Sequence, residues 1–323
     1  MIKLIQQKSG DLIHCTLPIF GIMNKETVIL IPIPALFSFQ ECLWFLNRNY
    51  DDCLHIIDEN SITKAIEFEG AIILIQITEN GNHLEVSLLS GTPSVNLSDF
   101  LIGYVQKWFD MDNNIQPFYD QLLNDGSLSY MVNKFKGLRL IGIEDLFEAI
   151  CWCIIGQQIN LSFAYKLKRR LVESFGTSIR MDDKSYYIFP KPQVLASASV
   201  DELRAMQFSQ QKATYLINIA KLFSEGQLSK AMLESLPDFQ SRKKLLIQQK
   251  GIGEWTANYA LMKSLKEPTC IPHGDVGLLN ALLNHNFISD RSELHKIDAL
   301  FARFAGWESY LVFYLWRSLA IKS

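Results

Sequence analysis

The sequence predicts an α+β protein, with an N-terminal antiparallel α/β domain followed by a mainly α-helical domain. Two observations support this fold class. Apolar residues alternate on either side of Asn80-Gly81, a dipeptide typical of a tight β-hairpin. From about residue 99 onward, apolar residues recur instead at the three- and four-residue spacing of helices.

The first domain begins with a strand-like segment and an apolar segment at helical spacing. Thr27 to Ile33 is rich in Ile and Val, and Phe37 to Asn49 predicts a helix with Phe39, Cys42, Leu43 and Leu46 on its apolar side. The two strands of the hairpin follow, at residues 71–77 and 83–88. Gly91 to Asp99 is polar and rich in small residues, so we expect the boundary there, between residues 1–98 and 99–323.

Capping residues delimit several helices of the second domain. Asp145 to Ile155 predicts one buried helix, and Ser162 is expected to cap the next, which ends at Gly176. Ser199 and Glu202 have the spacing of a capping box. Further helices are expected at residues 209–223, 275–283, 292–304 and 309–320.

Composition describes an ordinary globular protein. With 323 residues, 48% apolar and 20% charged, the chain can bury two cores. The net charge of −3 gives no global attraction for a polyanion, so nucleic-acid binding would need a local basic patch. No apolar run has membrane-spanning length and no signal-peptide core is present, so we expect an intracellular, cytoplasmic protein.

The six cysteines carry no metal-binding spacing, and buried free thiols are expected at Cys15, Cys42, Cys53, Cys151, Cys153 and Cys270. The six histidines likewise lack metal-ligand spacing.

The chain is organised around residues 238 to 275, which contain a glycine hairpin. Asp238 can cap a short helix, Gly251-Ile252-Gly253 interrupts the chain, and a second helix starts near Glu254. The glycines allow close approach of another backbone, and the N-terminal amides of the second helix attract an anion. The flanking basic residues favour a polyanion, and they are Arg242, Lys243, Lys244 and Lys250. The hairpin therefore suits binding to the sugar-phosphate backbone of a nucleic acid, without recognition of the base sequence.

The stretch from Leu246 to Ala257, followed by an isolated Asp275 in a Pro/Gly loop, resembles the helix-hairpin-helix (HhH-GPD) superfamily of base-excision DNA glycosylases. Within it, the sequence resembles the DNA-3-methyladenine glycosylase II family. The segments from Gly137 to Ile159 and from Trp307 to Arg317 carry the resemblance further. It covers residues 100 to 323 well and the first hundred loosely.

The resemblance implies that Asp275, twenty positions after Trp255, is the catalytic carboxylate. Cleavage of an N-glycosidic bond builds positive charge on the sugar, which an ionised carboxylate stabilises while it orients water. Taken alone, Asp275 also reads as a helix N-cap, and the two roles can coexist. Superfamily members that cut the strand place a Lys where this chain has Trp255, so we expect a monofunctional enzyme that leaves an abasic site.

The same resemblance predicts a base pocket lined by Trp255, Tyr259, Trp307 and Phe45. Aromatic faces attract a base that alkylation has made cationic. The alternative is that these aromatic residues belong to the core, which their helical spacing also allows.

For DNA contacts, the resemblance implies that Gln158 fills the space of a base flipped from damaged double-stranded DNA, although Gln158 also suits a helix terminus. Backbone contacts are expected at the residues Lys250, Gly251, Ile252, Gly253 and Thr256. The resemblance also implies a monovalent cation on the carbonyls of Ile247, Gln249 and Ile252. No iron-sulfur cluster is expected, because no cysteine follows Asp275, and we expect a monomer.

Two other functions stay open at the level of sequence. The same scaffold serves glycosylases for oxidised purines such as 8-oxoguanine, and the hairpin alone serves non-catalytic DNA-binding modules. The basic run Lys166 to Arg170 reads more readily as a solvated helix face than as a DNA contact.

Overall fold

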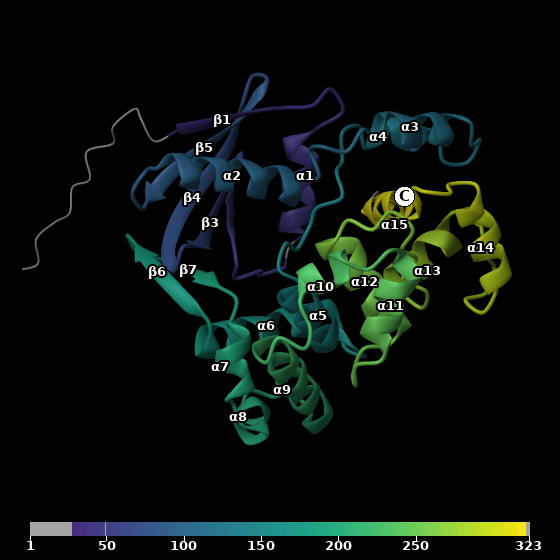
Figure 1. Cartoon of the computed structure of the whole chain (residues 1–323). Coiled ribbons are helices and arrows are strands. Elements are labelled where there is room, and N and C mark those ends of the chain that lie inside the picture. The colour runs from purple at the N-terminus through teal and green to yellow at the C-terminus, as the bar shows by residue number, and fades with distance from the viewer. Residues whose placement is uncertain (1–27, 49, 321–323) are drawn as a thin grey trace, which may run out of the picture.

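The computed structural model describes residues 28–48 and 50–320, and it opens with an antiparallel sheet (Figure 1). The sheet has the strand order β1-β5-β4-β3-β2, and every neighbouring pair is antiparallel. Its elements are β1 (Val28–Pro32), β2 (Ile56–Asp58), β3 (Ser61–Phe68), β4 (Ala71–Asn80) and β5 (His83–Ser90), with helix α1 (Phe39–Asn47) between the first two strands. The predicted N-terminal antiparallel α/β unit is confirmed.

The hairpin β4–β5 has the predicted turn. Asn80 pairs with His83, and Gly81 adopts φ 59°, in the left-handed region that glycine tolerates best. Along β4, Ile73, Ile75 and Ile77 are buried against the main core, as alternation requires.

Helix α2 (Val95–Trp108) follows the sheet and packs on it, with the ring of Phe100 centred 5.0 Å from that of Phe68. Ser94 caps this helix by accepting a hydrogen bond from the amide of Leu97. The predicted boundary between residues 98 and 99 therefore falls inside a helix, because the small polar residues before it form an N-cap and not a linker.

The rest of the chain is mainly helical. Its helices are α3 (Gln116–Leu123), α4 (Tyr130–Lys134), α5 (Leu146–Gly156), α6 (Leu161–Phe175), α7 (Pro192–Ala196), α8 (Val200–Ala205), α9 (Gln210–Ser224), α10 (Lys230–Glu234), α11 (Phe239–Ile247), α12 (Glu254–Ser264), α13 (Val276–Asn284), α14 (Leu294–Ala302) and α15 (Glu308–Ser318). A hairpin that the sequence analysis did not predict, β6 (Thr177–Met181) and β7 (Lys184–Ile188), interrupts them. It covers part of the other sheet face, where Tyr186 packs on Ala65 and Leu74.

The predicted helix caps are confirmed with one exception. Asp145 and Asp238 cap α5 and α11, and Ser199 and Glu202 form the capping box of α8. Ser162 was the wrong cap for α6. Asn160 caps that helix instead, accepting a 2.9 Å hydrogen bond from the amide of Phe163, so the helix starts earlier than predicted.

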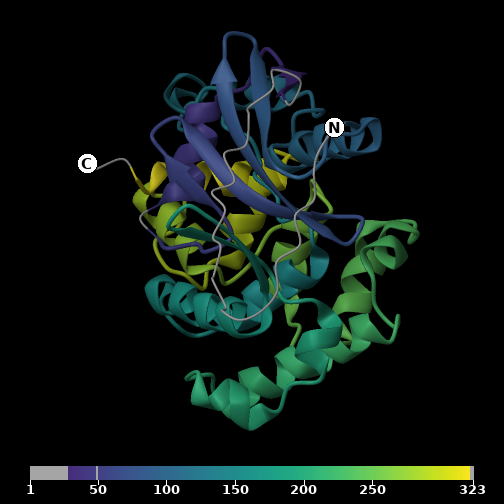
Figure 2. The same ribbon diagram turned by 90° about the vertical axis from the view of Figure 1, so that its left-hand side faces the viewer.

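The sheet unit and the helices share one hydrophobic core. In Figure 2 the yellow C-terminal helix α15 lies beside the purple α1. Phe313 of α15 packs on Phe45 of α1 with ring centroids 4.2 Å apart, and Arg317 pairs with Glu41 through a 2.7 Å contact. These contacts hold α1 against the helical region that carries the hairpin.

Five of the predicted thiols, Cys42, Cys53, Cys151, Cys153 and Cys270, are buried and free, which confirms that expectation for them. Cys15 lies outside the described residues. Within residues 28–48 and 50–320, no helix has the length and apolar character needed to cross a membrane.

Candidate active site

Asp275 stands at the N-terminus of α13, where its carboxylate has three protein donors. Oδ1 accepts a 2.7 Å hydrogen bond from the amide of Leu278, which makes Asp275 the N-cap of that helix. Oδ1 also accepts from the indole of Trp316 at 2.9 Å, and Oδ2 accepts from the indole of Trp255 at 3.2 Å. Among the described residues no cation pairs with this carboxylate, so the two neutral indoles and the helix end fix it while its charge stays uncompensated.

The loop before Asp275 is a tight turn. The amide of Asp275 donates to the carbonyl of Pro272 at 2.9 Å, and Gly274 between them has φ 83°. A side chain at position 274 would be strained in this left-handed conformation, so glycine suits the turn that delivers Asp275 to the site.

Gly277 allows the close contact between Asp275 and Trp316. A Cβ atom at position 277 would lie 3.1 Å from Oδ1 of Asp275 and 3.3 Å from the indole of Trp316. The second residue of α13 is therefore small where the indole of α15 approaches the carboxylate.

Three aromatic rings surround the carboxylate end of the site. Trp255 and Tyr259, one turn apart on α12, have ring centroids 5.6 Å apart, and Trp316 lies 6.0 Å from Tyr259. The structure does not bring Trp307 to this group. Its ring packs on Phe118 and Tyr310 at 6.0 and 5.5 Å, and Trp316, nine residues further along the chain, lies beside Tyr259 instead.

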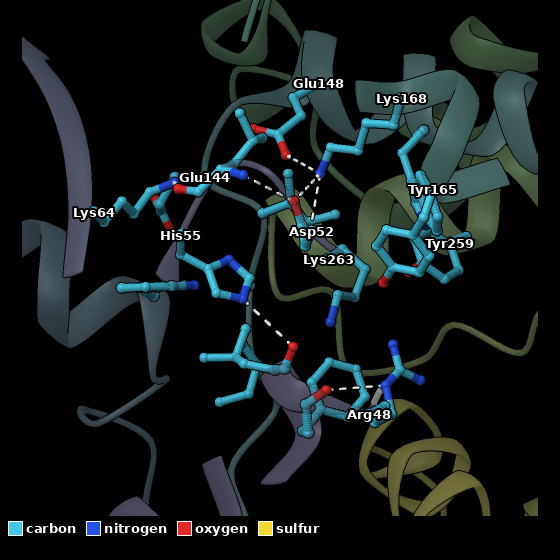
Figure 3. A pocket seen from close by; sticks show the side chains of 18 of the residues that line it. Arg48, Asp52, His55, Lys64, Glu144, Glu148, Tyr165, Lys168, Tyr259 and Lys263 are labelled. Atoms are coloured by element: carbon cyan, nitrogen blue, oxygen red, sulfur yellow. Dashed lines mark hydrogen bonds and ion pairs between the residues drawn. The ribbon is translucent and has the colours of Figure 1, made fainter. Parts of the chain in front are cut away.

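Phe45 and Tyr259 line one cavity of about 80 Å³ between the sheet unit and the helices (Figure 3). Two residues predicted from distant parts of the sequence are thus brought together. The cavity is more polar than predicted, because ten ionisable residues also line it: Arg48, Asp52, His55, Lys64, Tyr104, Glu144, Glu148, Tyr165, Lys168 and Lys263.

Phe45 is already flanked by two basic side chains of the protein. The Arg48 guanidinium carbon lies 4.1 Å from its ring centroid, and Nζ of Lys263 lies 4.6 Å away. The ring is only 7% exposed. The face of Phe45 is therefore less free to attract a cationic base than the faces of Trp255 and Tyr259.

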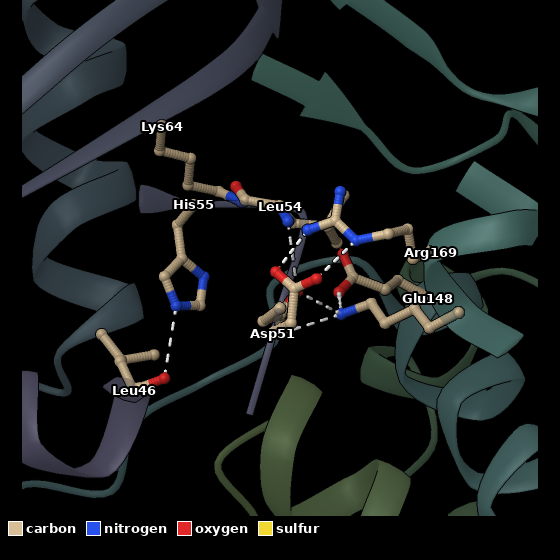
Figure 4. Close-up of polar contacts among 9 residues, drawn as sticks. Leu46, Asp51, Leu54, His55, Lys64, Glu148 and Arg169 are labelled. Carbon is tan, nitrogen blue, oxygen red and sulfur yellow. Dashed lines mark hydrogen bonds and ion pairs between the residues drawn. The ribbon is translucent and has the colours of Figure 1, made fainter. Parts of the chain in front are cut away.

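An ion-pair network closes the cavity on the side of α6 (Figure 4). Nζ of Lys168 contacts Asp52 at 3.1 Å and Glu148 at 3.2 Å, and Arg169 pairs with Asp51. Burial alone would raise the pKa of Asp52, but the Lys168 ammonium, His55 and the Leu54 amide outweigh it and hold that pKa below its usual value. The expected solvated face is thus wrong for Lys168, which is 3% exposed, because two carboxylates draw it inside.

The hairpin between α11 and α12 has the predicted form, and its two glycines differ. Gly251 has φ 99°, and a Cβ there would lie 2.6 Å from the ring of Tyr215, so this glycine serves the protein's own packing. Gly253 is exposed, caps α12 without a side-chain hydrogen bond and has open space where a Cβ would project. The anion-attracting amides at the start of α12 are therefore most accessible at Gly253.

The basic residues of the hairpin divide into two kinds. Arg242 pairs with Glu267 at 2.7 Å, and Lys243 pairs with Glu254, so both charges are compensated within the protein. Lys244 and Lys250 are exposed. Ile252 is 4% exposed and anchors the loop in the core.

Thr256 differs from the other predicted DNA-contact residues because its side chain is buried, at 1% exposure. Its hydroxyl accepts a 3.3 Å hydrogen bond from Nε2 of Gln157, which also donates to the carbonyl of Gly251 at 3.2 Å. The Thr256 hydroxyl therefore ties the hairpin to the end of α5, and its side chain is not accessible at the protein surface.

Gln158 follows directly and is exposed, with φ 56°. Left-handed backbone is uncommon for residues other than glycine, and such strain gathers at functional positions. Gln157 holds the turn against the hairpin through its hydrogen bonds, whereas Gln158 is exposed. An exposed side chain on a fixed turn suits insertion into a DNA duplex.

The predicted cation ligands lie at the end of α11. Helix C-termini leave carbonyl groups without intrahelical partners and carry partial negative charge, so the chemistry fits a cation. The carbonyl of Gln249 accepts a 3.1 Å hydrogen bond from the amide of Ile252, which leaves its second lone pair for an ion. The cation stays a prediction. Within the described residues, no group of three or more His, Cys, Asp or Glu side chains is arranged to hold a metal.

Three residues at the site were not predicted from the sequence, and they are Trp316, Lys263 and Gln157. Lys263 had a usable signal, since it follows Trp255 and Tyr259 at intervals of four residues and so lies near the same helix face. For Trp316 the sequence indicated only the C-terminal segment that contains it, because its partner Asp275 lies 41 positions away in the chain.

Family models and known proteins that are similar to this chain identify its family. The model of the "HhH-GPD superfamily base excision DNA repair protein" family matches residues 151–305, and that of the "8-oxoguanine DNA glycosylase, N-terminal domain" matches residues 46–150. A Bacillus subtilis DNA-3-methyladenine glycosylase is 39% identical over 90% of this chain and 97% of its own length. The chain belongs to the HhH-GPD superfamily.

Two further relatives of the superfamily extend the match. DNA-3-methyladenine glycosylase 2 of Escherichia coli is 29% identical over 77% of this chain and 82% of its own length, which confirms the predicted glycosylase II relationship. The structure of a 3-methyladenine DNA-glycosylase from Archaeoglobus fulgidus superposes with a TM-score of 0.78, at 22% identity, over 91% of this chain and 99% of that one. At that identity the superposition shows the shared fold.

Proposed function

We propose that this HhH-GPD protein is a DNA glycosylase that hydrolyses the N-glycosidic bond of alkylated purines, 3-methyladenine foremost, flipped out of duplex DNA. The observation that carries the proposal is Asp275, whose carboxylate is fixed by the indoles of Trp255 and Trp316 without a compensating cation among the described residues. The relatives named DNA-3-methyladenine glycosylase support the same substrate class. Such a reaction starts base-excision repair.

The carboxylate acts on the sugar and the rings act on the base. As the bond breaks, positive charge grows on the deoxyribose, and Asp275 stabilises it and orients the attacking water. Two indole donors and the helix N-terminus hold the carboxylate in place before the substrate arrives, so little reorganisation is needed during the reaction. An alkylated purine cation is already a good leaving group and needs no strong general acid.

We further infer that the enzyme does not cut the strand. Trp255 has no amine with which to form a Schiff base to the sugar. Lys263 follows it by eight residues, about 12 Å along the helix at about 1.5 Å per residue, towards the cavity and away from Asp275. Lys250 is exposed on the hairpin and suits a phosphate contact.

The aromatic faces favour alkylated purines over oxidised ones. The rings of Trp255 and Tyr259 lie 5.6 Å apart beside the carboxylate, and ring faces attract a cationic base. A neutral lesion such as 8-oxoguanine would depend on polar partners instead. A non-catalytic binding module would have no use for the fixed, uncompensated carboxylate of Asp275.

The proposed partner is damaged double-stranded DNA. Its backbone would bind at the exposed Gly253 end of α12, with the exposed Lys244 and Lys250 nearby, and Gln158 would enter the space of the flipped base. A monovalent cation at the Ile247, Gln249 and Ile252 carbonyls would add positive charge where the phosphate binds. We expect the protein to act as a monomer inside the cell, on chromosomal DNA.

Base release from methylated DNA tests the proposal. We expect the purified protein to release 3-methyladenine, and Asp275→Asn to lower the rate by about a hundredfold or more while duplex affinity is kept. Asn retains the N-cap, so the fold should survive. Unimpaired release by Asp275→Asn would refute the catalytic role, and a borohydride-trapped covalent complex with DNA would refute the monofunctional assignment.

A further inference from the structure

Lys263 is a buried amine without a hydrogen-bond partner. Its residue is 2% exposed, and Nζ has no partner among the described residues. Nζ lies 4.6 Å and 4.9 Å from the ring centroids of Phe45 and Phe313. A buried donor left unpaired costs free energy that a bound ligand can recover.

The amine lines the same cavity as two of the four predicted base-pocket residues. Lys263 and Tyr259 are one turn apart on α12, and together with Phe45 they line the cavity of about 80 Å³ (Figure 3). Asp275 and Trp255 mark the sugar end of the site, and Tyr259 lies next along the helix. Lys263 therefore stands at the base end.

The carboxylates around the cavity are engaged elsewhere. Asp52 and Glu148 contact Lys168, and Glu144 contacts Lys230. Burial lowers the pKa of Lys263 well below its ordinary value, and the positive charges of Lys266 and Arg48 lower it further. The surroundings of Nζ thus disfavour the ammonium form, and in either protonation state Nζ offers N–H donors to a ligand in the cavity.

We propose that Lys263 is a specificity-determining residue of the base pocket, whose Nζ donates a hydrogen bond to a ring-nitrogen or carbonyl acceptor on the flipped purine. The assignment rests on the proposed function, because it takes this cavity as the place that the base enters. Burial of Nζ favours the uncharged amine, which can bond to an alkylated purine without repelling its positive charge. A site with a buried unpaired donor discriminates strongly against a ligand that lacks the matching acceptor.

Binding of free bases tests the assignment without turnover. The probes are 3-methyladenine and indole, a bicyclic ring of similar shape that has no ring acceptor. For Lys263→Met we expect 3-methyladenine affinity to fall about tenfold or more, indole affinity to stay or rise, and the melting temperature to stay or rise. Lys263→Gln, which keeps an N–H donor, should restore part of the 3-methyladenine affinity.

The controls separate this role from a structural one. Lys221→Met removes an exposed lysine from α9 and should leave both affinities unchanged. Equal binding of 3-methyladenine by the wild type and Lys263→Met would overturn the inference, as would a loss of both probes together with a lower melting temperature. Failure of the proposed function is seen separately, as an absence of base release from methylated DNA by the wild-type protein.

Discussion

The indole Nε1 of Trp316 donates a 2.9 Å hydrogen bond to Oδ1 of Asp275, across 41 positions of sequence. The same oxygen caps α13, and the other carboxylate oxygen accepts from Trp255. The last long helix of the chain, the glycine hairpin and the catalytic loop therefore meet at one carboxylate.

Replacing Trp316 with Phe should lower base release by about tenfold to a hundredfold, because a hydrogen bond to a charged group is worth about 1.5–3 kcal/mol and the smaller phenyl ring cannot donate one. Trp307→Phe is the matched control, since Trp307 packs on Phe118 and Tyr310. Single-turnover release of 3-methyladenine measures both variants. A larger loss in Trp307→Phe than in Trp316→Phe would contradict the observed division between the two tryptophans.

The two glycines of the hairpin should respond differently to alanine. Gly251→Ala places a Cβ 2.6 Å from the ring of Tyr215 at φ 99°, so we expect a loss of stability of about 1–3 kcal/mol. Gly253→Ala meets no atom within 4 Å and should leave stability nearly unchanged, while it weakens duplex binding by crowding the phosphate. Urea unfolding and fluorescence anisotropy distinguish the two effects. Equal loss of stability in both variants would contradict the different roles assigned to Gly251 and Gly253.

Removing the buried cation at the edge of the cavity should destabilise the protein. Lys168→Met leaves Asp52 and Glu148 without their partner, and breaking a buried ion pair costs about 3–5 kcal/mol. Both carboxylates keep some exposure, so the lower end of that range is expected. Lys166→Met, on the exposed side of the same helix, should stay within about 0.5 kcal/mol of the wild type in chemical unfolding. A Lys168→Met variant as stable as Lys166→Met would show that the network contributes nothing.

The buried His55 should make a contribution to stability that is lost as the pH drops from 6.5 towards 4. Burial lowers the pKa of His55 from 6.5 to about 4, so in this interval the unfolded chain binds a proton that the folded protein resists. The contribution is fully present above pH 6.5 and is lost on acidification, by on the order of 1 kcal/mol. Asp145 acts oppositely, because burial raises its pKa to about 6 and favours the folded state as the pH falls.

Comparing His55→Gln with the wild type isolates the histidine, since Asp145 is common to both. Unfolding free energies at pH 7 and pH 5 should show a smaller acid loss in the variant. An identical loss in the two proteins would assign the pH dependence to other groups.

Local chemistry in the sequence predicted the elements that carry the site. Asp238 and the Gly251-Ile252-Gly253 turn give the hairpin, and the Asp275 cap gives the start of α13, because caps and glycine turns depend on neighbouring residues alone. Phe45 and Tyr259, which the family resemblance grouped together, line one cavity in the structure.

The misses came from packing between distant segments. Periodicity alone could not choose between Trp307 and Trp316, since both belong to the same apolar C-terminal segment and only the path of α15 decides which one meets Asp275. Nor could it show that Lys168 turns inward, because its partner Asp52 lies 116 positions away on the loop after α1.

The shared cavity has a consequence for how the protein could be divided. One wall, with Phe45 and Arg48, comes from the sheet unit, and the opposite wall, with Tyr259 and Lys263, comes from the hairpin helix. A fragment limited to the helices would lose one wall of this cavity, and it would also expose the hydrophobic core that the two parts share. Recognition of a lesion in this cavity therefore needs both parts of the polypeptide.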